Sequence, residues 1–118
     1  MRDYRKLKAF ELADALVLLV HAATRRFPKE ELFGLTSQVR RAAVSIPSNI
    51  VEGCARNTEK DYLHFLDVAY GSLKELTYQL SLAKRLGYLE NADELENKAE
   101  ETAKVLSGLI NALRKPGA

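Results

Sequence analysis

The sequence predicts an all-α protein, an antiparallel four-helix bundle of up-down-up-down topology whose second helix is kinked at Pro47. Three observations predict this fold. Hydrophobic residues make up 47% of the chain and charged residues 29%, with only six Gly and three Pro, a composition typical of a helical globular protein. Four segments carry apolar residues at alternating spacings of four and three, the pattern of helices that pack at a shallow angle. Short connections separate these segments, so neighbouring helices are expected to run antiparallel.

The first helix is predicted over residues 7–26. Its apolar stripe consists of Ala9, Ala13, Leu16, Val20, Ala23 and Phe27. Pro28 disfavours helix at the residue before it, which places the end of the helix near Arg26. Four more apolar residues lie off the stripe, and these are Leu12, Val17, Leu18 and Leu19. They indicate a second contact for this helix, although a fully enclosed bundle helix would have the same pattern.

The second helix is predicted to begin after a cap at Gly34 or Thr36 and to end between residues 53 and 56. Its main apolar stripe is formed by Leu35, Val39, Ala42, Ala43, Ile46, Ile50 and Gly53, and a second patch is formed by Val44, Val51 and Ala55. A helix with two apolar faces is typical of a central bundle helix that also meets a partner subunit. An interior proline costs ~3 kcal/mol in a regular helix, but the stripe keeps its phase on both sides of Pro47, which favours a kink over a break.

Polar residues form a continuous arc on the same helix. The arc contains Gln38, Arg41, Ser45, Ser48, Asn49, Glu52 and Arg56. We expect Arg41, Ser45, Asn49 and Glu52 to form one hydrogen-bonded structural network, because each can reach the next along the helix and an oligomer would bury them in part. A subunit contact accounts for this arc better than a catalytic role does.

The third helix, residues 59–86, has the most regular heptad. Its stripe is Tyr62, Leu66, Ala69, Leu73, Leu76, Leu80 and Ala83, and that of the fourth helix is Leu95, Ala99, Thr102, Leu106, Leu109 and Leu113. Thr58 is expected to cap the third helix together with Asp61, and Gly87 to follow its C-terminus. Asn91 with Glu94 is predicted to cap the fourth helix, and Pro116 with Gly117 to end it. Gly71 inside the third helix predicts close approach of a neighbouring backbone.

The chain of 118 residues is predicted to form a single domain, residues 1–118, large enough to bury a core without disulfides or metals. Its longest uncharged apolar run, residues 15–20, is far shorter than the ~20 residues that cross a bilayer. The basic start MRDYRKLK is not followed by the apolar core of a signal peptide. We therefore expect a cytoplasmic protein without a membrane partner.

Two segments carry a resemblance to a known family. The run LTSQVRRAAVSIPSNIVEG, residues 35–53, followed by FLDVAYGSLKELTYQL, residues 65–80, resembles the signature segments of four-helix-bundle proteins encoded within bacterial 23S rRNA intervening sequences. The similarity extends over nearly the whole chain, although the family commonly has Ala where this chain has Val51. That family is similar in fold to the accessory protein of diversity-generating retroelements. The resemblance implies a ring of five subunits that binds nucleic acid, and it brings no catalytic residues.

Residues with catalytic or metal-binding chemistry are sparse. His21 and His64 lie on different predicted helices, and the chain has no Glu-x-x-His motif of the kind that binds two metal ions in bundle proteins. No Gly-rich phosphate loop, nucleophile elbow or zinc-type spacing is present. Cys54 is the only cysteine and is expected to be a packing residue. We therefore predict no enzyme activity, no catalytic residue, no cofactor and no metal.

Basic residues are concentrated in the first half of the chain. Residues 1–60 carry eleven Lys and Arg against seven Asp and Glu, whereas residues 61–118 carry seven against nine. This asymmetry favours a polyanionic partner. The candidate contacts to RNA or DNA phosphates are Arg2, Arg5, Lys6, Arg25, Arg26, Lys29, Arg40 and Arg56. The aromatic residues fall mostly at core-like positions, so base stacking is not predicted.

Two functions are consistent with these features. The first is a non-enzymatic homo-oligomer, a pentamer by the resemblance, that binds nucleic acid through backbone phosphates. The alternative is a scaffold or adaptor that binds a partner protein. The predicted subunit interface contains Val44, Val51, Leu12 and Leu19.

Overall fold

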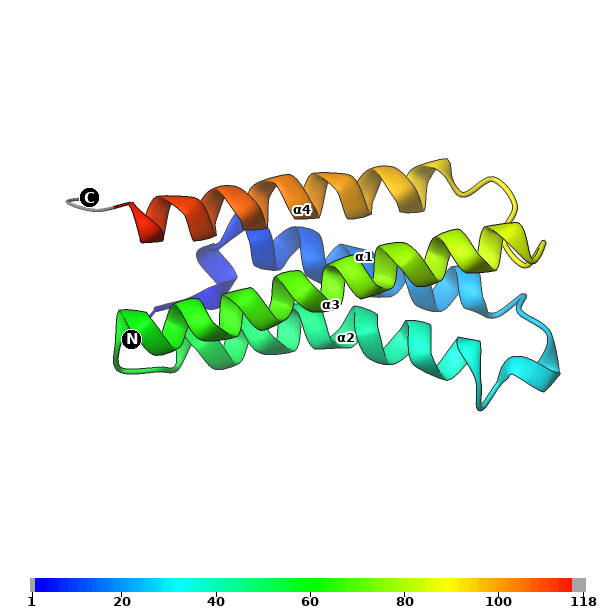
Figure 1. The fold of residues 1–118 in the computed structure, drawn as a ribbon, viewed down its shortest axis with the longest axis horizontal. Helices are drawn as coiled ribbons and strands as arrows, with labels where there is room; N and C mark the ends of the chain where they lie inside the picture. Colours follow the sequence, from blue (N-terminus) through cyan, green and yellow to red (C-terminus); the bar gives the residue numbers. More distant parts are fainter. Residues whose placement is uncertain (1, 116–118) are drawn as a thin grey trace.

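The computed structural model of the protein describes residues 2–115, which fold into four α-helices without a strand in that range. The helices are α1 (Lys8–Thr24), α2 (Leu35–Cys54), α3 (Glu59–Arg85) and α4 (Asp93–Arg114), with short 3₁₀ helices η1 (Tyr4–Lys6) and η2 (Lys29–Glu31). The predicted all-α four-helix fold is confirmed. Consecutive helices reverse direction along the long axis of the molecule, which measures 49 Å against 23 and 20 Å for the other two axes (Figure 1).

The core lies between the apolar stripes of the four helices. Every residue of the predicted α3 heptad, from Tyr62 to Ala83, is buried. Full burial of a large aliphatic side chain contributes about 1.5–3 kcal/mol, so these stripes supply most of the stability. Leu12, which the sequence analysis placed at a subunit interface, is only 3% exposed and belongs to the interior of the single chain. That prediction is wrong because α1 packs against both α2 and α4, which widens its buried face beyond one narrow stripe.

Helix α2 continues through Pro47 as one helix, which excludes the break considered above. The kink at Pro47 stays a prediction. Near its C-terminal end α2 packs closely on α3 at Gly53. A Cβ at this position would lie 3.0 Å from Cβ of Phe65 and 3.3 Å from the carbonyl oxygen of Tyr62, so the close approach of the two helices favours glycine here.

The start of α2 is capped from the preceding connection. Gly34 is the N-cap residue, as one of the two predicted alternatives had it, and it has no side chain to offer. The carboxylate of Glu31 takes that role, because its Oε1 accepts the backbone N–H of Leu35 at 3.1 Å. An acceptor at a helix N-terminus satisfies an N–H that has no partner within the helix.

The ends of α3 follow the prediction. The Thr58 hydroxyl oxygen accepts the N–H of Asp61 at 3.1 Å. Gly87 has φ of 80° and donates to the carbonyl of Lys84 at 3.1 Å, while the N–H of Tyr88 reaches the carbonyl of Ala83 at 2.9 Å. This pair of bonds is the Schellman motif, which fixes the direction in which the chain leaves the helix.

Two other predictions fail in this part of the chain. Asn91 does not cap α4: it has φ of 51°, Ala92 is the N-cap residue, and no side chain caps the helix. Asparagine tolerates a left-handed backbone conformation, and Asn91 adopts this conformation in the connection before α4 instead of capping the helix. A Cβ at Gly71 would meet no atom of residues 2–115 within 4 Å, so the close backbone approach expected there does not occur among these residues. Pro116 and Gly117, predicted to end α4, lie outside the described residues.

No helix within residues 2–115 is long and apolar enough to cross a membrane.

Candidate nucleic-acid interface

The eight predicted phosphate contacts do not form one surface. Residues 2–6 and Arg56 lie where α2 ends, because the N–H of Arg2 donates to the carbonyl of Cys54 at 3.3 Å. Residues 25–29 follow α1 and lie near the start of α2, at the opposite end of the bundle (Figure 1). A helix of twenty residues spans about 30 Å, so α2 alone keeps the two groups far apart.

Most cations at the first end are engaged within the chain. Arg5 pairs with Asp3 at 3.0 Å, and this hydrogen-bonded guanidinium lowers the pKa of the Asp3 carboxyl. Arg56 pairs with Glu52 at 3.0 Å. The guanidinium of Arg2 lies 3.9 Å from the centre of the Tyr62 ring, a cation–π contact that anchors the N-terminal segment. Lys6 is exposed and has no ion-pair partner among residues 2–115.

The cations at the opposite end are free. Arg25, Arg26 and Lys29 are all exposed, and within the described chain none of them forms an ion pair. The three come within five positions of the chain, where α1 ends and η2 begins. Because no carboxylate neutralises them, they are available to an anionic ligand.

Arg40 has a structural role beside this group. Its Nε donates to the hydroxyl of Thr24 at 2.8 Å and its Nη2 to the carbonyl of His21 at 3.4 Å, which joins α2 to the last turn of α1. Both acceptors are neutral, so the positive charge is retained while the side chain is held in place. Arg40 therefore adds a positive charge to this end of the bundle, and its side chain is held in place by the two hydrogen bonds to α1.

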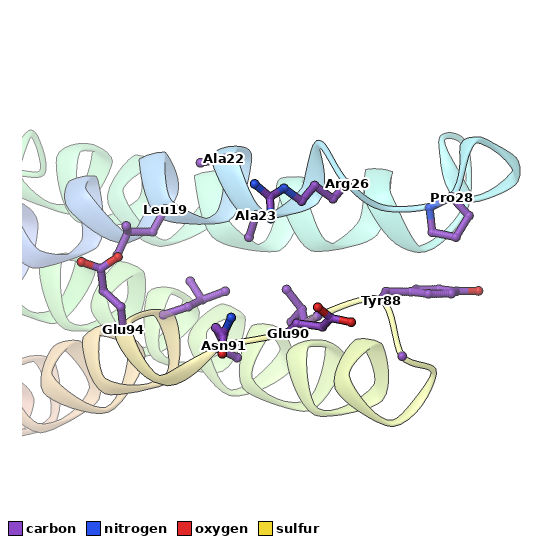
Figure 2. Close-up of a pocket in the computed structure, with 13 residues that line it drawn as sticks. Leu19, Ala22, Ala23, Arg26, Pro28, Tyr88, Glu90, Asn91 and Glu94 are labelled. Atoms are coloured by element: carbon purple, nitrogen blue, oxygen red, sulfur yellow. The ribbon is translucent and has the colours of Figure 1, made fainter.

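A cleft of about 610 Å³ adjoins the same end of the bundle. Figure 2 shows Leu19, Ala22, Ala23 and Arg26 of α1 and the turn after it on one side, and Glu90, Asn91 and Glu94 on the other. Arg26 is thus both a predicted phosphate contact and a residue of the cleft wall. Glu90, Asn91 and Glu94 were not predicted as site residues, because α1 and the start of α4 are far apart in sequence and no spacing connects them. Asn91 offers one local signal, since asparagine is enriched at left-handed backbone positions.

The family described as 23S rRNA-intervening sequence protein matches residues 5–108. The chain belongs to the 23S rRNA-intervening sequence protein family. One structural relative is the crystal structure of a protein of unknown function from the S23 ribosomal protein family of Bacteroides thetaiotaomicron VPI-5482. The two share 21% sequence identity with a TM-score of 0.79, over 87% of this chain and 95% of that one, a likeness that concerns the fold alone. No curated protein matches the chain significantly.

In this 23S rRNA-intervening sequence protein, two of the four residues of the predicted polar network are joined. The Asn49 amide donates to the Ser45 hydroxyl at 3.0 Å and to its carbonyl at 2.8 Å. The Ser45 hydroxyl also lies 2.8 Å from that of Ser72 on α3, a partner that the sequence analysis did not select. Arg41 is exposed without an ion-pair partner in residues 2–115, and Glu52 is engaged by Arg56. Within the single chain, Ser45 and Asn49 are therefore hydrogen-bonded to each other, and the charged residues Arg41 and Glu52 are not joined to them.

Exposed apolar side chains mark further surfaces of this family member. Val44 on α2 is 43% exposed and Leu18 on α1 is 68% exposed, whereas Leu19 and Val51 are half-buried. The ring of Phe33, in the connection before α2, is 94% exposed. Phe33 and Tyr78 are the exceptions to the expectation that the aromatic residues fall mostly at core-like positions, and the other seven are at least partly buried. Within residues 2–115 no cluster of side chains has the composition of a metal site.

Proposed function

We propose that this protein is a non-enzymatic homo-oligomer, a ring of five, that binds RNA or DNA through backbone phosphates. The observation that carries the proposal is the group of exposed cations formed by Arg25, Arg26 and Lys29, none of which has an ion-pair partner in the described part of the chain. Exposed cations without internal partners can neutralise phosphates without first breaking ion pairs, and they release the counterions of the nucleic acid. Membership of a family named after 23S rRNA intervening sequences supports a link to nucleic acid.

Assembly would make this small group effective. Three cations on one protomer give weak binding, but a ring repeats them, and each further contact then becomes intramolecular with a high effective concentration. Exposed Leu18 and Val44 and half-buried Val51 offer an apolar surface on α1 and α2 for the subunit contact. The number five comes from the family resemblance.

Light scattering tests the assembly. A pentamer has about five times the 13.2 kDa mass of the chain at micromolar concentration. A stable 13.2 kDa monomer would overturn the oligomer. Val44→Asp is expected to shift the protein toward the monomer, because a carboxylate buried without a partner in an apolar contact is strongly unfavourable.

Salt-dependent titration tests the phosphate contacts. Labelled RNA and duplex DNA are titrated between about 50 and 200 mM salt, where log affinity should fall by about 0.7 per phosphate contact on single strands and 0.9 on duplex for each tenfold rise in salt. The Arg25→Ala, Arg26→Ala double variant should bind more weakly and with a shallower slope. A matched control is the Lys84→Ala, Lys98→Ala double variant, which removes the same charge from residues already paired with Glu96 and Glu101. Undetectable binding at low salt would rule the proposal out.

A partner-protein scaffold is the second candidate, and the exposure of Phe33 favours it. An exposed aromatic ring is the kind of anchor that dominates protein interfaces. The adjacent Leu32 is also half exposed. If the protein is an adaptor, Phe33→Ala should abolish binding of a defined partner and the Arg25→Ala, Arg26→Ala variant should retain it. If it binds nucleic acid through phosphates alone, Phe33→Ala should leave the titration unchanged.

A further inference from the structure

The cleft beside the basic end has the volume of a ligand site. Its volume of about 610 Å³ lies within the range of about 300–1,000 Å³ that small-molecule sites occupy. Its apolar floor includes the buried Leu89, Ala92 and Leu95. On the α1 side, the small side chains of Ala22 and Ala23 lie beside Leu19, Arg26 and Pro28, and they leave room for a flat ring.

The polar groups of the cleft are divided between its two walls. Arg26 supplies a guanidinium on the α1 side, and Glu90 and Glu94 supply carboxylates on the α4 side, with Asn91 between them in the view of Figure 2. None of the three charged residues forms an ion pair within residues 2–115. A ligand that is anionic at one end and carries N–H donors at the other is complementary to this division.

The wall that carries the carboxylates is held in place before any ligand binds. The connection from α3 to α4 starts with the Schellman bonds of Gly87 and Tyr88. The Tyr88 ring packs on that of Phe27 at 5.6 Å between centroids, and its hydroxyl donates to Glu31 at 3.0 Å. Asn91 keeps a left-handed backbone in the same connection. A preformed wall loses little conformational entropy on binding.

We propose that this cleft accepts an unpaired nucleobase with an exocyclic amino group, from the strand whose phosphate contacts Arg26. The inference rests on the proposed function and adds base selection to it. Carboxylates are acceptors only, so Glu90 and Glu94 favour the amino groups of cytosine, adenine and guanine, and they repel the carbonyl of uracil at the corresponding position. The Asn91 amide can both donate and accept, and it can complete the contact with the base edge. The phosphate is kept on the α1 side by Arg26, away from the carboxylates.

Oligo(C) and oligo(U) of equal length test the inference, because cytosine has an exocyclic amino group where uracil has a carbonyl oxygen, and N3 changes with it from an acceptor to an N–H donor. At low salt the protein should bind oligo(C) about tenfold more tightly than oligo(U). This factor lies near the lower end of the discrimination that a good base contact gives. The Glu90→Gln, Glu94→Gln double variant should bring the ratio close to one. The Glu75→Gln, Glu100→Gln variant is a matched control, since both glutamates are exposed, lie outside the cleft and form no ion pair within residues 2–115. It should change both affinities while keeping the ratio.

A second variant fills the cleft without changing charge. Ala23→Leu should lose the preference for oligo(C), whereas Ala112→Leu, on an exposed position near the other end of α4, should keep it. Equal binding of the two oligonucleotides, with weaker binding by the Arg25→Ala, Arg26→Ala variant, would overturn the nucleobase site and leave the phosphate contacts standing. No binding of either oligonucleotide would overturn both. Free cytidine monophosphate that binds as tightly as oligo(C) would assign the cleft to a nucleotide and overturn the assignment to a strand.

Discussion

The hydroxyl of Tyr88 donates a 3.0 Å hydrogen bond to Oε2 of Glu31, a residue 57 positions earlier in the chain. The other oxygen of the same carboxylate accepts the N–H of Leu35. One side chain thus caps α2 and ties the α1–α2 connection to the α3–α4 connection. The bond to Glu31 also raises the pKa of the Tyr88 hydroxyl. Both the free cations and the cleft lie at this end of the bundle, so Glu31 is a key residue for their geometry.

Glu31→Ala should destabilise the protein by about 1 kcal/mol, the usual effect of losing a helix N-cap acceptor. Glu30→Ala is the matched control, because the neighbouring carboxylate is exposed and has no hydrogen-bond partner in the described chain. Urea unfolding of both variants measures the effect. Equal midpoints for the two would show that the Glu31 bonds add nothing.

Gly53→Ala and Gly71→Ala should change stability in opposite directions, although both replace a glycine inside a helix. At Gly53 the added methyl meets Phe65 Cβ at 3.0 Å and backbone at 3.3 Å, and such overpacking costs about 1–3 kcal/mol. At Gly71 the methyl meets nothing, so the substitution should stabilise by about 0.5–1 kcal/mol through helix propensity. Thermal melts compare the pair. A loss of stability at Gly71 would instead indicate a neighbouring subunit against this face.

The fold could be predicted from the sequence because it depends on local periodicity. The α3 heptad from Tyr62 to Ala83 is entirely buried, and the predicted ends of α1, α2 and α3 differ from the observed ones by at most two residues. Details that depend on the packing of neighbouring elements were harder to predict from the sequence. Leu12 is buried because α1 has two packing partners, and the close approach expected at Gly71 occurs instead at Gly53.

The candidate site could be predicted only in part, since charge in a sequence does not reveal which cations are paired. Arg5 and Arg25 are equally basic in the sequence, yet Arg5 is bound to Asp3 and Arg25 forms no ion pair within residues 2–115. Arg40 is held by Thr24, sixteen positions away, through a contact that no local spacing indicates. The cleft joins α1 to the start of α4 and exists only in the folded chain.

Arg41→Ala and Glu52→Ala test whether assembly completes the polar network. If a neighbouring subunit buries both residues with Ser45 and Asn49, each substitution should cost about 3–5 kcal/mol in the assembled protein, because its partner is left unpaired. The surface ion pair of Glu52 with Arg56 alone is worth only about 0–1 kcal/mol. Melts at concentrations that favour the oligomer distinguish the two cases, and near-wild-type stability for both variants would mean that the arc is solvated.

The environment of Tyr62 predicts the response of the protein to alkaline pH. This side chain is 2% exposed, and burial, followed by the nearby Cys54 thiol, raises the pKa of its hydroxyl from 10.0 to about 12. The folded protein therefore holds this proton more tightly than the unfolded chain does. The stability that results is fully present below pH 10 and is lost as the pH rises from about 10 to about 12.

Tyr62→Phe should remove this alkaline loss, because phenylalanine has no proton to release. A difference of two pKa units corresponds to roughly 2–3 kcal/mol between the limits of this window. Urea midpoints at about pH 8, 10 and 11.5 should fall steeply in the wild type and less steeply in the variant. Tyr78→Phe is the matched control, since the Tyr78 ring is well exposed and its removal should leave the wild-type slope. Comparing the slopes of urea midpoint against pH also separates the effect of Tyr62 ionisation from any pH-independent loss of stability that removing the hydroxyl near Cys54 causes. An unchanged alkaline slope in Tyr62→Phe would contradict the prediction and assign the loss to other groups, with Tyr88 the next to test because its pKa is also raised.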